Sequence, residues 1–413
     1  MSRLNNLVLT ALGTVFLFGC GGGGSPSSSA GGSGGGIVAA PAPTPSPTTS
    51  PEPAPTATPA GSVVGTNTED GYPQLNKIAT NFSKAGLLSP SWGTGAIASP
   101  MPDGDNQGAF RFMCKPSHLA YDDPVVFPGQ KGRSHLHMFF GNTLANGDST
   151  YESLRTTGQS TCNNALNRSA YWIPALFNGR GQVIMPDAIS IYYKRELPAD
   201  KMCKEGKGCI GLPRGLRYVF GRTMSGGSRD HSYFSCDHPS APGSFDTLVD
   251  AAKACPIGAK IGAVVEAPSC WNGTELDSPD HRSHMAHMSR GADGALHCPS
   301  THPYMIPRFT IGVWYTVDDT LDRSGNTSPT LRTWYFSSDR MEGMTPQTSG
   351  ATFHADWFGA WDDDTMATWL ANCIEKRLSC TGGDLGNGTQ LAYSAEFNAD
   401  RPRLVAVPEK PAS

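Results

Sequence analysis

Charged residues are scarce in this chain of 413 residues, and neither sign of charge dominates. Only 16% of the residues are charged, and 32 Lys and Arg against 36 Asp and Glu leave a formal net charge of −4. Proteins that mainly bind nucleic acid usually concentrate basic residues, so this balance argues against such a partner. The sequence also has no Walker loop and no HExxH segment, which excludes two common nucleotide and zinc-protease signatures.

Long apolar runs are missing as well. Residues 7–18 form an apolar run of about a dozen residues, which is too short for a helix that crosses a bilayer. The run follows Arg3 and ends in Leu17-Phe18-Gly19-Cys20, which resembles the lipobox of bacterial lipoproteins. We therefore expect residues 1–20 to be a lipoprotein signal peptide with the lipid on Cys20. An ordinary signal peptide cut nearby is the alternative.

Residues 21–65 have few large apolar side chains and consist mostly of Gly, Ser, Pro, Thr and Ala. The first part is rich in Gly and Ser, and the second part is rich in Pro and Thr. Such a segment cannot bury enough apolar surface to offset its conformational entropy. We expect a disordered tether that holds a folded body away from a membrane, in a bacterial cell envelope facing the periplasm or the exterior.

Paired CxxC motifs are absent, although the sequence has 11 cysteines. A zinc site built from cysteines is therefore disfavoured. With Cys20 set aside for the lipid, ten cysteines remain, and an exported chain can join them in five disulfides. The sequence does not fix their connectivity, but nearest-neighbour pairing keeps each loop local: Cys114–Cys162, Cys203–Cys209, Cys236–Cys255, Cys270–Cys298 and Cys373–Cys380.

The remainder, residues 66–413, has the composition of a single globular β-rich domain, although two closely packed halves are an alternative. Short runs rich in Val, Ile, Tyr, Phe and Trp are bounded by Gly, Pro, Asn and Asp, which indicates strands. Helical periodicity is found only near residues 245–254 and 362–378. We expect a mainly β fold, a β-sandwich or jelly-roll-like body with long loops, a few short helices and about five disulfides.

The 11 histidines are unevenly distributed. His135 and His137 are spaced i and i+2, and so are His354 and Asp356, which places each pair on one face if the segment is a strand. Five further histidines fall between positions 281 and 302. Single histidines are often surface groups or hydrogen-bonded core residues, but this pattern favours a shared site.

Several segments within about residues 108–361 carry a further pattern. They are Phe112–Pro124, Pro128-Gly129, Ser134–His137, Phe139–Asn142, Tyr151–Arg155, Asn167–Leu176, Tyr192–Lys194, Cys270–Gly273, Leu276–His281, Ser283-His284, Cys298-Pro299 and His302-Pro303. These segments resemble the family of the domain of unknown function DUF1996. The resemblance implies an extracellular protein found in the company of carbohydrate-binding modules, and it implies no catalytic residues.

We expect this protein to act on extracellular polysaccharide as a hydrolase or lyase through a His/Asp pocket, and to meet the membrane only through its lipid. A metal-dependent enzyme and a non-catalytic carbohydrate-binding module are the alternatives. Histidine titrates near neutral pH and can therefore serve as a general acid or base. Arg and Lys can bind an acidic sugar, and Trp can stack on a sugar ring. The candidate catalytic residues are His135, His137, His284, Asp280 and Tyr121; the candidate substrate-binding residues are Arg155, Lys194, Trp172 and Trp271; a divalent metal ion would use His135, His137, His354 and Asp356.

Overall fold

The computed structural model describes residues 61–103, 107–226 and 231–411. The expected signal peptide, Cys20 and residues 21–60 of the expected tether lie outside these residues. The last part of that segment is not a tether, because β1 (Val63–Val64) pairs antiparallel with β16 (Glu275–Asp277). Two adjacent β-branched residues favour extended structure and find an open strand edge. The ordered body therefore begins a few residues earlier than the composition indicates.

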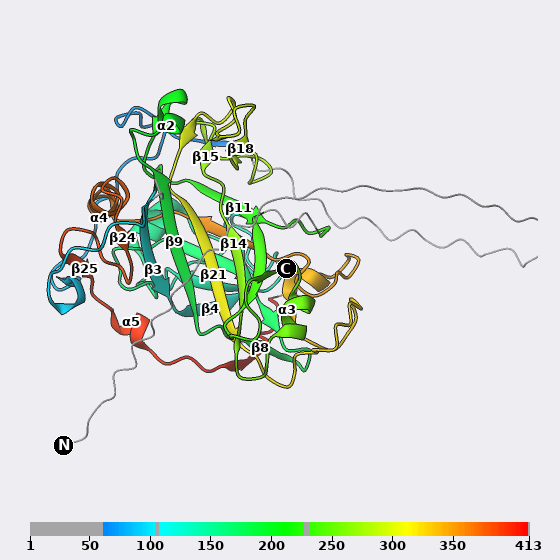
Figure 1. The fold of residues 1–413 in the computed structure, drawn as a ribbon. Helices are drawn as coiled ribbons and strands as arrows, with labels where there is room; N and C mark the ends of the chain where they lie inside the picture. Colours follow the sequence, from blue (N-terminus) through cyan, green and yellow to red (C-terminus); the bar gives the residue numbers. More distant parts are fainter. Residues whose placement is uncertain (1–60, 104–106, 227–230, 412–413) are drawn as a thin grey trace, which may run out of the picture. The chain divides into compact units, whose positions relative to one another are not determined.

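The largest sheet in the described residues has seven strands and is antiparallel except at one edge. Its long central strands lie side by side in Figure 1. Alternate residues of these strands, such as Phe110, Phe112, Ile191 and Tyr193, point into the main hydrophobic core. In order, the strands are β13 (Ser244–Phe245), β12 (Ser232–Cys236), β14 (Lys260–Glu266), β21 (Arg308–Thr316), β9 (Ala188–Glu196), β3 (Gln107–Cys114) and β24 (Ser379–Cys380).

A second sheet, with five antiparallel strands, packs against the first. Met138 and Phe140 belong to the same core cluster as the seven-stranded sheet, whereas Phe139 and Trp172 belong to a separate cluster on the outer face. This is the β-sandwich that the sequence predicts. The strands are β11 (Arg217–Gly221), β23 (His354–Phe358), β6 (Ala170–Pro174), β5 (His137–Gly141) and β4 (Pro116–Ala120).

Small sheets and short helices surround the sandwich. The remaining described strands are β2 (Leu88–Pro90), β7 (Leu176–Phe177), β8 (Gln182–Ile184), β10 (Gly208–Cys209), β15 (Cys270–Trp271), β17 (Met285–Ala286), β18 (Ser289–Arg290), β19 (Leu296–His297), β20 (Tyr304–Met305), β22 (Tyr335–Phe336), β25 (Thr389–Leu391) and β26 (Leu404–Ala406). The helices are α1 (Tyr151–Thr156), α2 (Lys201–Glu205), α3 (Leu248–Ala254), α4 (Asp363–Trp369) and α5 (Ala395–Asn398), with single helical turns at Ser91–Gly93, Ser337–Arg340 and Leu370–Ile374. Both helices expected from periodicity are present in shorter form as α3 and α4.

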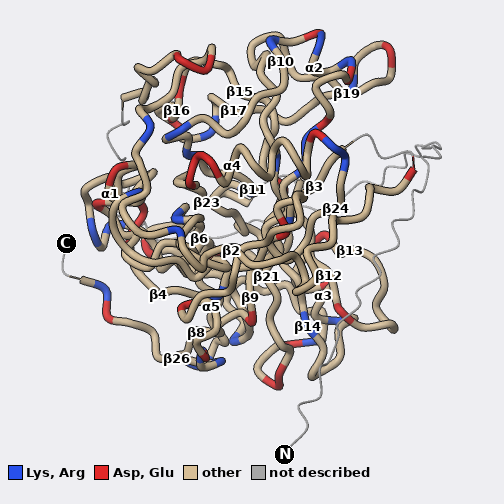
Figure 2. The backbone as a smooth tube through the Cα atoms, turned by 90° about the vertical axis from the view of Figure 1, so that its left-hand side faces the viewer, with Lys and Arg blue, Asp and Glu red and all other residues tan. Residues whose placement is uncertain are grey.

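Disulfides join all ten cysteines of the described residues, in the nearest-neighbour pairing. Such bonds persist in oxidising compartments, so the protein is extracytoplasmic. In the part of the chain that the structure describes, we find no helix with the length and apolar character needed to span a bilayer. Lys and Arg alternate with Asp and Glu along the backbone, as expected from the small net charge (Figure 2).

Two tryptophans that we expected to stack on sugar rings are buried instead. Trp172 and Trp271 are both 0% exposed. Trp172 stacks on Phe139 with ring centroids 5.3 Å apart, and the Trp271 indole N–H donates to the Glu275 carbonyl at 2.6 Å. A large aromatic ring contributes more to the stability of the fold when it is buried in the core than when it lies at the surface. The prediction that they bind substrate is therefore wrong.

Arg155 is also inside the protein, and the prediction that it binds an acidic sugar is wrong. It lies on α1 and is 1% exposed, and its guanidinium donates to the carbonyls of Ala360 and Ile78 and to the Thr80 hydroxyl. Its charge is balanced by Asp362, whose carboxylate is 3.8 Å away. Asp362 also caps α4 and pairs with Lys84 at 2.9 Å. Arg155 therefore joins α1 to the segment before α4.

We predict that Trp172→Ala lowers the free energy of unfolding by about 3–5 kcal/mol, the usual cost of removing a buried aromatic ring. Tyr233→Ala is the matched control, because Tyr233 is 41% exposed and should cost much less. Urea unfolding of both variants measures the difference. Equal and small costs would show that Trp172 lies at the surface.

A second prediction concerns Asp362. Burial alone would raise the pKa of Asp362, but hydrogen bonds from Thr80, Lys84 and Thr365 lower it to about 2. Its charge therefore stabilises the fold above the unfolded pKa of about 4, and this contribution is lost as the pH falls towards 2. We expect Asp362→Asn to cost about 1–2 kcal/mol at pH 7 and progressively less below pH 4, in urea unfolding at each pH.

The control for this prediction is Asp319→Asn, because Asp319 forms an exposed ion pair with Arg180. Exposed pairs contribute little to stability, so this variant should track the wild type at every pH. A cost of Asp362→Asn that stays constant between pH 7 and pH 3 would contradict the assignment.

Candidate functional site

Two histidines meet on the outer face of the five-stranded sheet. His137 begins β5 and His354 begins β23, and β6 lies between these strands. His137 is opposite Pro174 of β6, and the pairing of Asp356 with Trp172 places His354 level with the same proline. Proline has a small, compact ring, so the two imidazoles can lean towards each other above it. Their ring centroids are 6.1 Å apart.

His135 joins them from the bend before β5. We expected His135 and His137 on one face of one strand, but the strand starts only at His137. The bend brings the two rings even closer, with centroids 4.1 Å apart, and the His135 ring is 5.3 Å from that of His354. One ring nitrogen of each histidine lies within 4.8 Å of the corresponding nitrogen of the other two. We call these three residues the deep cluster.

The hydrogen bonds of the deep cluster fix which nitrogen faces inward. Nδ1 of His137 donates to the Asp122 carbonyl at 2.9 Å, and Nδ1 of His354 donates to the Thr352 carbonyl at 2.8 Å. Nδ1 of His135 is 2.9 Å from the Ser337 hydroxyl. That hydroxyl donates its own proton to the Leu136 carbonyl, so it accepts from His135. All three Nε2 atoms therefore carry a lone pair.

Two carboxylates flank the deep cluster. Asp356 and Asp123 are 1% and 3% exposed, and each places an oxygen within 4.8 Å of the other and of a His137 ring nitrogen. Asp123 accepts hydrogen bonds from the backbone of Val125 and Val126. Oδ2 of Asp356 and Nε2 of His137 are buried and have no hydrogen-bond partner. Such orphaned atoms are rare in native proteins, and a bound ion would satisfy both.

Burial controls the charge state of these groups. It lowers the pKa of His137 to about 3, with a further contribution from His354, and it lowers the pKa values of His135 and His354 well below the usual range. The imidazoles are therefore neutral at physiological pH. Burial raises the pKa of Asp123 to about 6, and burial together with the Asp123 charge raises that of Asp356 strongly. Only a cation would allow both carboxylates to ionise easily.

The donor set fits a transition-metal ion. The usual protein ligands of Zn²⁺ and similar ions include neutral imidazoles. One ring nitrogen of such an imidazole binds the ion, and the N–H of the other donates to a backbone carbonyl or to an oriented hydroxyl. Three imidazoles leave one coordination position for water or for a carboxylate such as that of Asp356. His135 is half-buried, whereas His137 and His354 are 0% and 2% exposed. His135 is therefore the most exposed member of the deep cluster.

Two other predicted catalytic residues lie apart from the deep cluster. Both ring nitrogens of His284 are engaged, by the Ser278 hydroxyl at 2.7 Å and the Arg217 carbonyl at 3.0 Å. Asp280 accepts from Ser278, Ser283 and Arg282, and these bonds overcome the effect of burial and lower its pKa. His284 and Asp280 thus hold the turn before β17, and their assignment to catalysis has no geometric support.

Tyr121 and Lys194 also have other surroundings. The Tyr121 hydroxyl donates to the Pro408 carbonyl at 3.2 Å, which ties the C-terminal segment to the residue that follows β4. Lys194 lies on β9 and its ammonium is 5.1 Å from the centre of the Tyr192 ring. Because Tyr193 points into the core, Tyr192 and Lys194 are on the outer face of the seven-stranded sheet. Both sheets separate Lys194 from the deep cluster.

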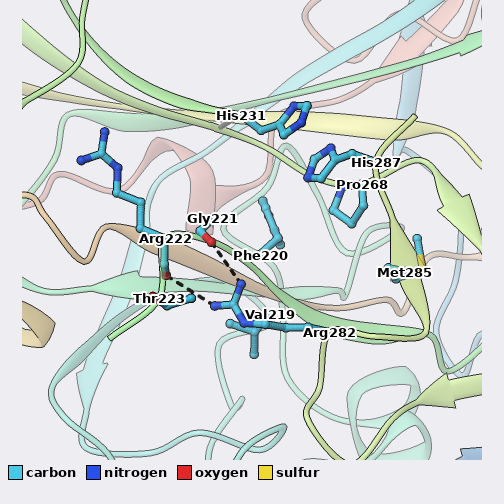
Figure 3. Close-up of a pocket in the computed structure, with 10 residues that line it drawn as sticks. All are labelled: Val219, Phe220, Gly221, Arg222, Thr223, His231, Pro268, Arg282, Met285 and His287. Atoms are coloured by element: carbon cyan, nitrogen blue, oxygen red, sulfur yellow. Dashed lines mark hydrogen bonds between the residues drawn. The ribbon is translucent and has the colours of Figure 1, made fainter. Parts of the chain in front are cut away.

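Arg282 is a residue that the sequence analysis missed. Its guanidinium donates to the carbonyls of Gly221 and Arg222 and forms part of the wall of a pocket of about 260 Å³ (Figure 3). Its charge also acts on Asp356 and His354, so it lies between the pocket and the deep cluster. Asp123 is not among the candidate site residues that the sequence indicates either. Both residues fall next to or within segments that carry the family resemblance, which is the only sequence signal for them.

Comparison with known proteins identifies the family. No curated protein and no solved structure matches the chain at a significant level. One family model, described as a domain of unknown function (DUF1996), matches residues 123–361. This range begins at Asp123, ends just after β23, and contains every residue of the deep cluster and both flanking carboxylates. The match covers more than half of the chain, and the protein therefore belongs to the DUF1996 family.

Proposed function

We propose that the deep cluster binds one divalent transition-metal ion through Nε2 of His135, His137 and His354. The observation that carries this proposal is the grouping of three imidazoles, each with Nδ1 hydrogen-bonded and Nε2 left with a lone pair, and with one ring nitrogen of each within 4.8 Å of the other two. A hydrogen-bonded core network would satisfy these nitrogens, but Nε2 of His137 has no partner. Burying an unsatisfied acceptor costs roughly 1–3 kcal/mol, which a bound ion would offset.

The sequence suggested Asp356 as a metal ligand, but the proposal gives it a place next to the ion, together with Asp123. Asp356 Oδ2 is 3.7 Å from Nε2 of His354, and Asp356 groups with Asp123 and His137 instead of with all three histidines. The ion would therefore have three imidazole ligands. Asp356 would lie beside the fourth position, where its carboxylate can accept a proton from water.

We propose a hydrolytic role for this centre. A bound divalent ion lowers the pKa of a coordinated water and polarises the bond to be cleaved. The substrate would be an extracellular polysaccharide, since the disulfides place the protein outside the cytoplasm and the polymer would meet it there. A lipid on Cys20 would hold the protein at the cell envelope. The half-buried edge at His135 would admit the scissile bond.

A structural metal site in a non-catalytic binding module is the second candidate. The observation in its favour is the low exposure of His137, His354 and Asp356, at 0%, 2% and 1%. Structural zinc sites are closed by four protein ligands, whereas catalytic sites keep one position open. Metal content and turnover separate these two roles.

We predict that the purified full chain without a polyhistidine tag binds close to one equivalent of Zn²⁺ in the deep cluster, and that His137→Ala abolishes this equivalent. The control is His118→Ala, because His118 is half-buried and belongs to none of the groups of possible metal ligands in the described residues. Elemental analysis after dialysis measures the metal. Equal metal content of His137→Ala and the wild type would overturn the proposal.

The hydrolytic role makes a separate prediction. The double variant His135→Ala/His137→Ala should lose the release of reducing ends from polysaccharides by at least about 100-fold, while it still binds the polymer. The His118→Ala variant should keep its activity. A lyase would also release reducing ends, and its unsaturated products would distinguish it from a hydrolase. Binding without any turnover by the metal-loaded wild type would favour the structural site in a binding module.

A further inference from the structure

A second group of possible metal ligands lies at the pocket that Arg282 helps to form. His231 and His287 both line this pocket and lie next to each other in Figure 3. Together with Glu266 they place one ring nitrogen each and a carboxylate oxygen within 4.8 Å of one another. We call these three residues the rim cluster. It is distinct from the deep cluster, because it shares no residue with it and is more exposed to solvent.

The backbone holds two members of the rim cluster in place. Glu266 is the last residue of β14, and His231 directly precedes β12, its neighbour in the seven-stranded sheet. The amide of Glu266 donates to the His231 carbonyl at 2.7 Å, which extends the ladder between Ser232 and Val265 by one bond. His231 adopts a positive φ of 63° at this point, and its Nδ1 lies 3.7 Å from Oε1 of Glu266.

His287 completes the group from the other side. It follows β17, and its ring stacks on that of His231 with centroids 3.4 Å apart and an angle of 3° between the planes. An ion that is bound by two imidazoles lies close to the plane of each ring. Two parallel, stacked rings have no such common position, because their planes do not meet. Metal binding therefore requires the rings to tilt apart, which the exposure of His231 permits.

We propose that the rim cluster is a second site for a divalent transition-metal ion, with His231, His287 and Glu266 as its ligands. Two imidazoles and one glutamate are a known zinc ligand set that leaves a position open, and here that position faces the pocket. Glu266 is ionised, since His231 and Arg308 overcome the effect of burial and lower its pKa. The rim site goes beyond the proposed function and does not depend on it.

Nearby positive charges set the expected affinity. The Arg308 guanidinium is 3.8 Å from Oε1 of Glu266, although it is closer to Glu196, at 3.2 Å. Arg282 also belongs to the pocket wall. These cations oppose the binding of a further cation, and the rim cluster has no third imidazole. The rim site is therefore weaker than the deep site and exchanges its ion with solvent.

The test is a titration of the chelator-stripped full chain, without a polyhistidine tag, with Zn²⁺ in competition with a chromophoric chelator. We expect two classes of site in the wild type. Glu266→Gln and His231→Asn should each weaken the second class by more than about tenfold and leave the first unchanged. Asn is chosen because it tolerates positive φ. His238→Asn is the control, since His238 is exposed and lies outside both clusters.

The outcomes for the two sites can be told apart. If both rim variants bind Zn²⁺ with the stoichiometry and affinities of the wild type, the rim site is overturned, whatever happens at the deep cluster. If His137→Ala keeps the first class of site, the proposed function fails while the rim site stands. A wild type with one class that His137→Ala removes and Glu266→Gln does not change would also overturn the rim site.

Discussion

The arrangement of the deep cluster on the five-stranded sheet depends on the free-energy cost of taking polar side chains out of water. The five-stranded sheet is covered on both faces, and every residue of β5 and β23 is buried. A strand of this kind normally carries apolar side chains only. Here its outer face holds His137, His354 and Asp356. Each of these side chains lowers the stability of the fold unless its polar atoms find hydrogen-bond partners. Backbone carbonyls are the partners of the Nδ1 atoms of the two histidines only.

Compensation of the remaining atoms links the fold to the proposed chemistry. A buried carboxylate of raised pKa is costly to ionise, and a nearby cation would lower that pKa again, while the lone pairs of the neutral imidazoles are available to bind the cation. The same burial would make an ion bind tightly, because little water competes for it. The sheet supplies the rigidity, since β6 keeps the two histidine-bearing strands at a fixed separation.

The sequence predicted those parts of the site that depend on the period of a strand. The spacing of His354 and Asp356 was sufficient, because side chains two residues apart share a face. The grouping of these two residues with His135 and His137 was proposed from residue types alone, since β5 and β23 are far apart in the chain and only the sheet order places them on either side of β6. The burial of Trp172, Trp271 and Arg155 was not predictable, because composition does not show which aromatic or charged residue faces the core. Nearest-neighbour disulfides were predictable because they close short, local loops.

The pairing of β1 with β16 has a mechanical consequence. Any pulling force transmitted through the chain before Val63 acts first on this two-stranded pair, since β1 pairs with β16 alone among the described strands. Asp277 of β16 binds both His281 and Arg217, which begins β11 of the five-stranded sheet, and the next residues along the chain lead to Arg282 at the pocket. Tension at the N-terminal end would therefore reach the sandwich through β11 and the pocket wall through the segment after Asp277, so that ligand binding at the pocket could respond to load.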